Sequence, residues 1–178
     1  KLLAARTQRE TPFIDTTLYT SLNGMLIASY FHAFSVIGNE ESRTFAVQSL
    51  ERILNERLIN GRLYHTANIT AVLDDYVHLI DALIAGYEAT AASRYLALAD
   101  ELMAACVEKF HDPQEGGFFD TEDNVLGTRL KRIEDVPHVS ANALAIMLLL
   151  KLSLMTGKDA YRQQAERSLR LFARSALE

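Results

Sequence analysis

Polar residues of the kinds that bind hydroxyl groups or anions stand at the start of three long apolar runs in this sequence. Asn23 lies near the start of the first run, Asp75 and Tyr76 open the second, and Asn142 opens the third. If the runs are helices, their N-terminal N–H groups would favour anions or hydroxyl-rich ligands at these ends. The pattern therefore predicts a ligand pocket lined by Asn23, Asp75, Tyr76 and Asn142.

A structural interpretation of these positions is also open. Thr20, Asp74 and Ser140 have side chains that cap helix N-termini, each cap contributing about 1 kcal/mol. The two asparagines would then tie loops together. Capping is the favoured role for Asp74 and Ser140, whereas the Asp-Tyr pair that follows fits a pocket and a scaffold equally well.

A second set of polar residues lies on the long segment before the third run. Arg129 and Lys131 alternate, so in an extended loop both would point to one side and hold a carboxylate, a phosphate or a partner aspartate. A solvated charged loop is the simpler alternative. Asp135 and His138 are the weak candidates for catalysis, because a carboxylate and an imidazole can form an acid/base pair near neutral pH.

Metal and cofactor signatures are weak in this sequence. His78 lies one helical turn after Asp74, a spacing that permits a hydrogen bond or a two-point metal site. Neither H-E-x-x-H nor a third obvious ligand accompanies the pair. G-x-S-x-G, P-loop and G-x-G-x-x-G motifs are also absent. We therefore predict no metal site and no cofactor.

The elements that must position these residues are helices, because apolar residues recur three and four apart through most of the chain. The predicted helices cover about residues 21–37, 41–58, 73–90, 93–110, 140–155 and 159–176. They form three copies of one unit, an apolar helix followed by an amphipathic one, with Ala46, Ala99 and Ala165 in register. The chain is thus predicted to be a single all-α domain, residues 1–178, of three αα-hairpins at about 20–60, 73–111 and 139–177.

An apolar helix paired with a two-faced one cannot be buried by its own hairpin and needs neighbours on both sides. A ring satisfies this need, with first helices inside, second helices outside and the connecting loops on one rim. Three hairpins form part of an (α/α)6 toroid, so we expect a fragment of a larger barrel. Uncovered flanks on the first and last inner helices would favour a homodimer or docking onto missing hairpins.

Composition narrows the classes of partner. The formal net charge of −5 provides no basic field for nucleic acid. The apolar stretch 143–155 is too short to span a membrane and contains Lys151. A lone cysteine, Cys106, favours a reducing, cytoplasmic setting. The chain opens on Lys1, so we expect its natural N-terminus and any targeting signal to lie upstream.

Several motifs follow one another along nearly the whole chain: KLLAARTQRE and PFID near the start, TSLNGMLI at 20–27, LDDYVHLIDALIAGYEAT at 73–90, DPQEGGFFDT at 112–121, R-x-K at 129–131 and SANALA at 140–145. In this order they resemble the C-terminal helical part of the YyaL-type proteins, the thioredoxin-domain-containing family (DUF255) with a spermatogenesis-associated member. The resemblance implies an (α/α) barrel similar to N-acylglucosamine 2-epimerases and six-hairpin glycosidases, after a thioredoxin-like domain that this chain lacks.

Departures from the family pattern point to an altered pocket. Leu22 stands where the family usually has Trp, residues 15–17 read D-T-T instead of D-D-K, and residues 139–143 read V-S-A-N-A instead of P-S-G-N-S. The chain has no Trp, although aromatic platforms are common in sugar sites.

The function that the resemblance implies is carbohydrate binding or processing, with isomerase or epimerase chemistry ahead of hydrolysis and a sugar or sugar derivative as ligand. No pair of acidic residues with glycosidase character stands out. The alternative is a non-catalytic helical scaffold or protein-interaction module with a degenerate ancestral pocket.

Overall fold

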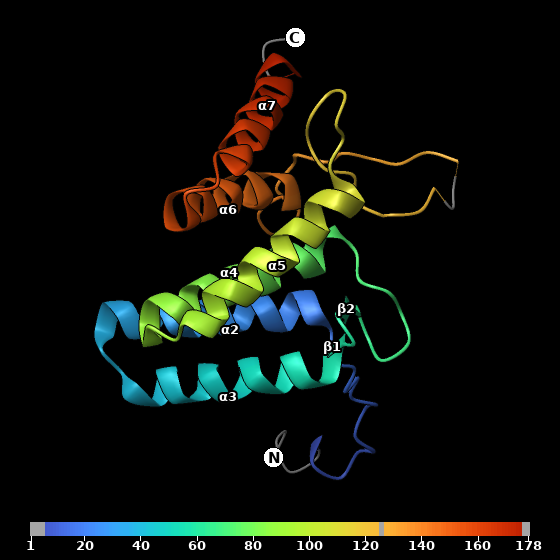
Figure 1. Cartoon of the computed structure of the whole chain (residues 1–178). Helices are drawn as coiled ribbons and strands as arrows, with labels where there is room; N and C mark the ends of the chain where they lie inside the picture. The colour runs from blue at the N-terminus through green and yellow to red at the C-terminus, as the bar shows by residue number, and fades with distance from the viewer. Residues whose placement is uncertain (1–5, 125–126, 176–178) are drawn as a thin grey trace.

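Three antiparallel helix pairs follow one another along the chain in the computed structural model, which describes residues 6–124 and 127–175 (Figure 1). The pairs are α2 (Thr20–Ile37) with α3 (Glu40–Arg57), α4 (Leu73–Thr90) with α5 (Ser93–Phe110), and α6 (Ala141–Thr156) with α7 (Asp159–Ser175). Every predicted helix is present with its ends displaced by one residue at most; the predicted last residue of α7, Ala176, lies outside the described residues. The all-α hairpin prediction is confirmed.

The first helix of each pair is an inner helix. α4 packs between α2 and α6 and also contacts its hairpin partner α5. From Leu73 to Gly86 it is almost wholly buried, the exceptions being Asp74 and Asp81. The second helices α3, α5 and α7 expose polar faces, and Cys106 lies in the buried stripe of α5.

α2 and α4 approach each other closely because Gly24 has no side chain. A Cβ atom at this position would lie 2.8 Å from the backbone carbon and oxygen of His78. The glycine therefore lets two helix backbones meet directly behind the N-terminal half of α4.

Successive outer helices are joined by a repeated contact. Tyr95 on α5 donates a hydrogen bond of 2.7 Å to Glu51 on α3, and Tyr161 on α7 donates one of 2.8 Å to Asp100 on α5. In each case a cation, Arg94 or Lys158, lies over the tyrosine ring and pairs with the same carboxylate. The two tyrosines occupy equivalent positions in the repeat, so the repetition seen in the sequence extends to the packing.

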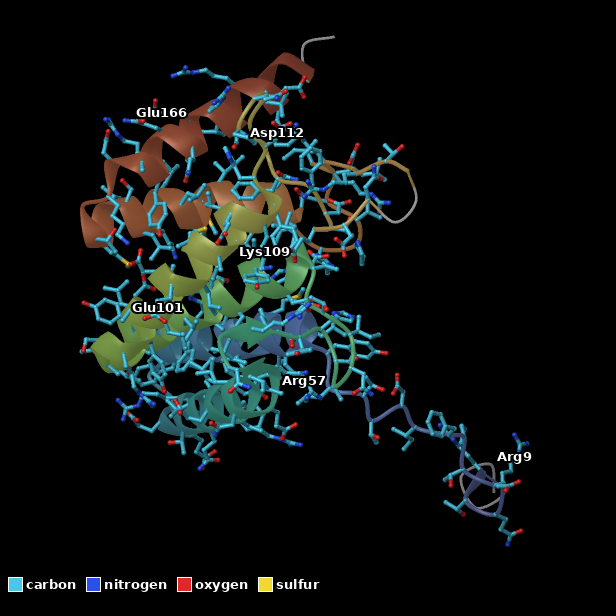
Figure 2. The ribbon with its side chains drawn as sticks, turned by 45° about the vertical axis from the view of Figure 1, so that its right-hand side comes forward. Arg9, Arg57, Glu101, Lys109, Asp112 and Glu166 are labelled. Atoms are coloured by element: carbon cyan, nitrogen blue, oxygen red, sulfur yellow. The ribbon has the colours of Figure 1, made fainter. Side chains whose placement is uncertain are left out.

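The loops between hairpins gather at the N-terminal ends of the inner helices. The Thr20 N–H donates to the His65 carbonyl and the Leu73 N–H donates to the Asp120 carbonyl, at 3.0 and 3.1 Å. Both loops contain short extended pieces: β1 (Leu58–Ile59) pairs with β2 (Arg62–Leu63), and His111 bridges to Phe118. Residues 6–19, with Arg9 among them, extend away from the helices (Figure 2).

The apolar surface is uneven. Large apolar side chains are exposed on the first and last inner helices, Leu22 and Leu26 on α2 and Met147 and Leu154 on α6. Among the described helices, none has the length and apolarity needed to cross a membrane.

Candidate functional site

A cleft of about 970 Å³ opens at the rim where the inner helices α4 and α6 begin. Its walls come from the segment before α4 and from the long loop before α6. The side chains that carry charge or can acquire it there are those of Arg62, Asp74, Asp120, Glu122, Asp123, Arg132, Glu134 and His138. The cleft combines groups that donate and accept hydrogen bonds with apolar walls, as small-molecule sites do.

Asp75 lies behind this cleft. Its carboxylate is fully buried and accepts hydrogen bonds from the backbone N–H groups of Val72 and Ser21, both at 2.9 Å. His65 Nδ1 lies 2.9 and 3.0 Å from the two carboxylate oxygens. Asp75 therefore joins the N-terminal ends of α2 and α4 to the loop between them.

The capping prediction is wrong for Asp74 and for Thr20. α4 begins at Leu73, so Asp74 lies inside the first turn, and it is Asp75 that accepts from the Val72 N–H. Likewise α2 begins at Thr20, which donates its hydroxyl to the Tyr64 carbonyl instead of capping the helix. The prediction named the wrong aspartate by one residue, because either Asp74 or Asp75 fits the sequence pattern of a helix cap. Ser140 caps α6 as predicted, accepting from the Ala143 N–H.

Asn142 is also buried and ties the long loop to α6. Its side-chain oxygen accepts from the Phe118 N–H at 2.7 Å, and its side-chain nitrogen donates to the carbonyls of Phe118 and Arg132 at 2.9 Å. Asn23 donates to the Tyr19 carbonyl one turn before it on the chain, at 2.8 Å. Neither asparagine is among the residues that line the cleft.

Tyr76 packs in the core beneath the rim. It is buried, and its ring lies edge-on to that of Phe110 with a centroid separation of 5.4 Å. Burial, with smaller contributions from nearby acidic groups, raises the pKa of Tyr76 to about 12. Its hydroxyl is protonated at neutral pH and is not on the cleft wall.

Arg129 and Lys131 point to the same side, as their alternation predicts, and both lie over the ring of Phe119. Lys131 pairs with Asp112 at 2.6 Å, so the acceptor is a partner aspartate from this chain. Arg129 donates to the carbonyls of Thr121 and Lys109. Figure 2 shows Asp112 in the loop beside α7 and Lys109 near the end of α5. These two cations line a separate, smaller hollow outside the main cleft.

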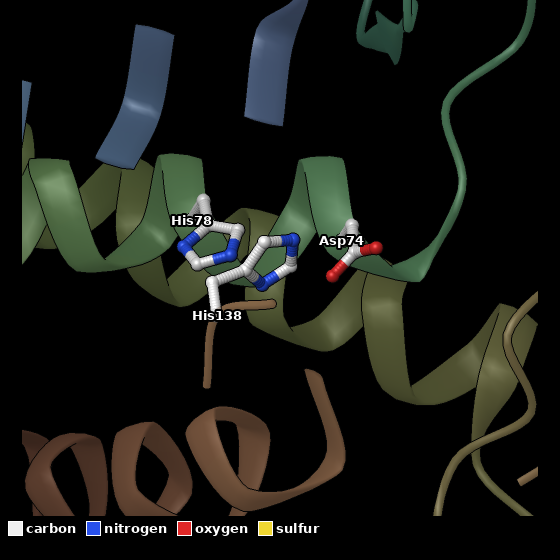
Figure 3. Close-up of side chains that lie close together, drawn as sticks. All are labelled: Asp74, His78 and His138. Carbon is white, nitrogen blue, oxygen red and sulfur yellow. The ribbon is translucent and has the colours of Figure 1, made fainter. Parts of the chain in front are cut away.

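Asp135 and His138 have different partners in the described structure. The Asp135 carboxylate accepts from the Ser140 N–H at 2.8 Å, and His138 Nδ1 lies 3.1 Å from the Val139 carbonyl. The structure brings His138 instead to Asp74 and His78 (Figure 3). Of the residues proposed from sequence as pocket-lining or catalytic (Asn23, Asp75, Tyr76, Arg129, Lys131, Asp135, His138 and Asn142), His138 lines the cleft.

Asp120, one of the polar residues of the long loop, and Arg132, which the sequence did not single out, also line the cleft. Burial raises the pKa of Asp120 above its ordinary value; Asp74 and Glu134 add to this, while Arg132, at 3.3 Å, opposes it. Asp120 was visible in the sequence only as an acidic residue on the loop, because its approach to α4 depends on the path of that loop.

Solved structures define the class of fold. The GH76 α-mannanase of Bacteroides thetaiotaomicron superposes on 92% of this chain and 45% of its own, with a TM-score of 0.71 and 17% identity. Cellobiose 2-epimerase of Spirochaeta thermophila gives a TM-score of 0.68 at 15% identity over 88% of this chain and 43% of its own. A D-mannose isomerase gives 0.65 at 15% identity, covering 87% and 44%. The chain therefore has the fold of about half an (α/α)6 barrel, as the repeats predict.

Sequence relatives identify the ancestry of the chain more narrowly than the solved structures do. The chain is 27% identical over 175 residues to human spermatogenesis-associated protein 20, covering 88% of this chain and 22% of the relative. It is 30% identical over 181 residues to an uncharacterised protein of Caenorhabditis elegans, covering 93% and 25%. These matches confirm the resemblance to the spermatogenesis-associated family, and the chain spans about a quarter of the length of these relatives. No family model matches the chain.

Proposed function

We propose that the rim cleft binds a carbohydrate and that the barrel to which this chain corresponds processes it. The observation that carries the proposal is the cleft itself, lined by carboxylates, cations and His138 at the N-terminal ends of the inner helices of a half-barrel. Solved barrels of the same fold are mannanases, sugar epimerases and a sugar isomerase. A neutral sugar needs several donors and acceptors at once, and the cleft walls provide both.

The adjacent aspartates support the same proposal. An inactive variant of the α-1,6-mannanase of Salegentibacter sp. HEL1_6, solved with α-1,6-mannotriose, has two consecutive aspartates changed to asparagine. This chain has two consecutive aspartates at the start of α4, of which Asp74 lines the cleft and Asp75 is buried behind it. In our proposal Asp74 contacts the sugar and Asp75 positions the backbone that carries Asp74.

Isomerase or epimerase chemistry suits the groups in the cleft better than hydrolysis. Moving a proton at a sugar carbon requires positioned acid and base groups. The imidazole of His138 and the carboxyl group of Asp120 lie in the cleft, and burial raises the pKa of Asp120 above its ordinary value. Asn23, Asp75, Tyr76 and Asn142 then act as the scaffold that holds the rim, and Arg129 and Lys131 hold the loop.

The alternative function is a non-catalytic helical scaffold, and the contacts that hold the rim together also support it. The side chains of Asp75 and Asn142 form their hydrogen bonds with backbone groups of this chain. In that case the exposed apolar residues of α2 and α6 are the functional surface. We propose that these flanks pack against further αα-hairpins that complete the barrel, because solved barrels of this fold are about twice as long as this chain.

Ligand-observed NMR and calorimetry with α-1,6-mannotriose, cellobiose and mannose test the carbohydrate proposal. We expect this chain, or its full-length parent, to bind one of these sugars. The Asp120→Asn variant should bind it at least tenfold more weakly. Asp159→Asn, on the far outer helix, is the matched control and should bind as the wild type does. If none of these sugars binds to either protein, the scaffold function is preferred, and light scattering then tests whether the flanks hold a second copy.

A further inference from the structure

Three potential metal ligands converge where the long loop crosses α4. One ligand atom from each of Asp74, His78 and His138 lies within 4.8 Å of the other two. The two histidine rings meet edge to face, with centroids 5.5 Å apart. Figure 3 shows the carboxylate of Asp74 directed to the space beside these rings.

A buried, unpartnered nitrogen provides an independent reason to expect a ligand. His78 is 2% exposed, and its Nε2 atom has no hydrogen-bond partner among the described residues. A buried polar atom without a partner costs about 1 to 3 kcal/mol. A bound cation would compensate this cost, since a ring nitrogen without a proton is a metal ligand.

The surroundings of His78 favour a cation. The charged groups that act on it besides His138 are the carboxylates of Asp74, Asp81 and Asp75.

We propose that Asp74, His78 and His138 bind one divalent transition-metal ion, Zn²⁺ in the first place. Two imidazoles and one carboxylate are a donor set that zinc accepts, with a fourth position left for water or substrate. Asp74 and His138 line the cleft, so the fourth position faces it. The cleft would thus hold a Lewis acid beside the bound ligand.

The geometry requires only a small adjustment. Ligand atoms of a tetrahedral zinc site with bonds of about 2.0 to 2.2 Å lie about 3.4 Å apart, so the 4.8 Å limit must shrink by about 1 to 1.5 Å. His78 and Asp74 are fixed on α4, one turn apart. His138 is partly exposed on a loop, and its side chain is the one that can turn inward.

Titration of the untagged, EDTA-treated chain with ZnCl₂ tests the proposal, using a chromophoric chelator as competitor. We expect one ion per chain, and a visible absorption spectrum of tetrahedral Co²⁺ when CoCl₂ replaces zinc. His138→Ala and Asp74→Asn should each weaken binding by about 100-fold or more, because each removes a direct ligand. Neither residue is fully buried, so both variants should fold, which circular dichroism checks.

His32→Ala is the matched control, since His32 is an exposed histidine on α2. It should leave zinc affinity unchanged. Zinc binding that persists in both ligand variants, or that His32→Ala abolishes, would show an adventitious surface site and overturn the proposal, as would no binding at micromolar zinc. The result is independent of the proposed carbohydrate function, because the zinc titration contains no sugar and the sugar titrations can be repeated in EDTA.

Discussion

Ser21 and Asp75 lie 54 residues apart in the sequence, yet the Ser21 N–H donates a hydrogen bond of 2.9 Å to the buried Asp75 carboxylate. The same carboxylate accepts from Val72 and lies beside His65. One side chain thus satisfies N–H groups at the starts of two adjacent inner helices, which are donors that a helix cannot satisfy internally. The rim of the half-barrel depends on this contact.

Asp75→Asn is therefore expected to lower the free energy of unfolding by about 2 to 4 kcal/mol. The amide presents an NH₂ group where the carboxylate had an acceptor, so at least one buried donor faces another donor. Urea unfolding followed by circular dichroism, in EDTA, measures the change.

Asp74→Asn is the control for this experiment, because the neighbouring aspartate is partly exposed and sits in the first turn of the same helix. Its cost should stay below about 1 kcal/mol, the size of an exposed charge at a helix N-terminus. Equal losses in the two variants would contradict the role given to Asp75.

Gly24→Ala is expected to destabilise the chain by about 2 to 3 kcal/mol, although alanine is the better helix former by about 1 kcal/mol. The new methyl group would meet the backbone of His78 at 2.8 Å, and a backbone cannot rotate away as a side chain does. Thermal unfolding of the variant measures the loss.

Gly86→Ala separates this clash from a general effect of alanine in a helix. The nearest atoms there are side-chain atoms of Leu50 and Phe31, at 3.2 Å, which can yield by a few tenths of an ångström. We expect a change under about 1 kcal/mol in either direction. A Gly24 variant as stable as the Gly86 variant would show that α2 and α4 can separate without loss.

Tyr161→Phe tests the repeated contact between outer helices. It removes the hydroxyl that donates to Asp100 but keeps the ring, so a loss of about 1 kcal/mol is expected from chemical unfolding. Tyr87→Phe is the control, because its hydroxyl has no hydrogen bond within the described residues, and it should change stability by under about 0.5 kcal/mol. Similar losses in both would mean that the contact with Asp100 contributes nothing.

The helices could be predicted from sequence because each buries one face, which leaves a 3.6-residue period that can be read residue by residue. The hairpin repeat was visible for the same reason. Ala46, Ala99 and Ala165 are fully buried at equivalent positions of the three outer helices. The half-ring followed from the apolar character of the first helices, and α4 is buried on nearly all sides.

The cleft could not be predicted in the same way, because the loop before α6 has no period to reveal its path. Asp74 and His78 were recognisable as neighbours on one helix face, but their meeting with His138 depends on how residues 127–139 run past α4. Asp75 and Asn142 were recognised as polar residues at helix starts. What sequence could not show is that their partners are Ser21, in another hairpin, and Phe118, in the long loop.

The pair of Lys131 and Asp112 gives a prediction for pH. Burial alone would raise the pKa of Asp112, but the hydrogen bonds from Lys131 and from the N–H groups of Gln114 and Glu115 outweigh it and lower the pKa from 3.8 to about 2. A carboxyl group with a lowered pKa in the folded state stabilises the fold above its unfolded pKa. This stability, about 2 kcal/mol at most, should be lost as the pH falls from about 4 to about 2.

Asp112→Asn isolates this effect, since asparagine keeps the oxygen that accepts from the loop N–H groups but does not titrate. Unfolding in urea between pH 2 and pH 5 should show the wild type more stable than the variant at pH 5, with the difference vanishing near pH 2. The other acidic groups titrate in both proteins and cancel in the comparison. Parallel stability curves over this range would mean that Lys131 and Asp112 attract each other no more strongly than a solvated pair.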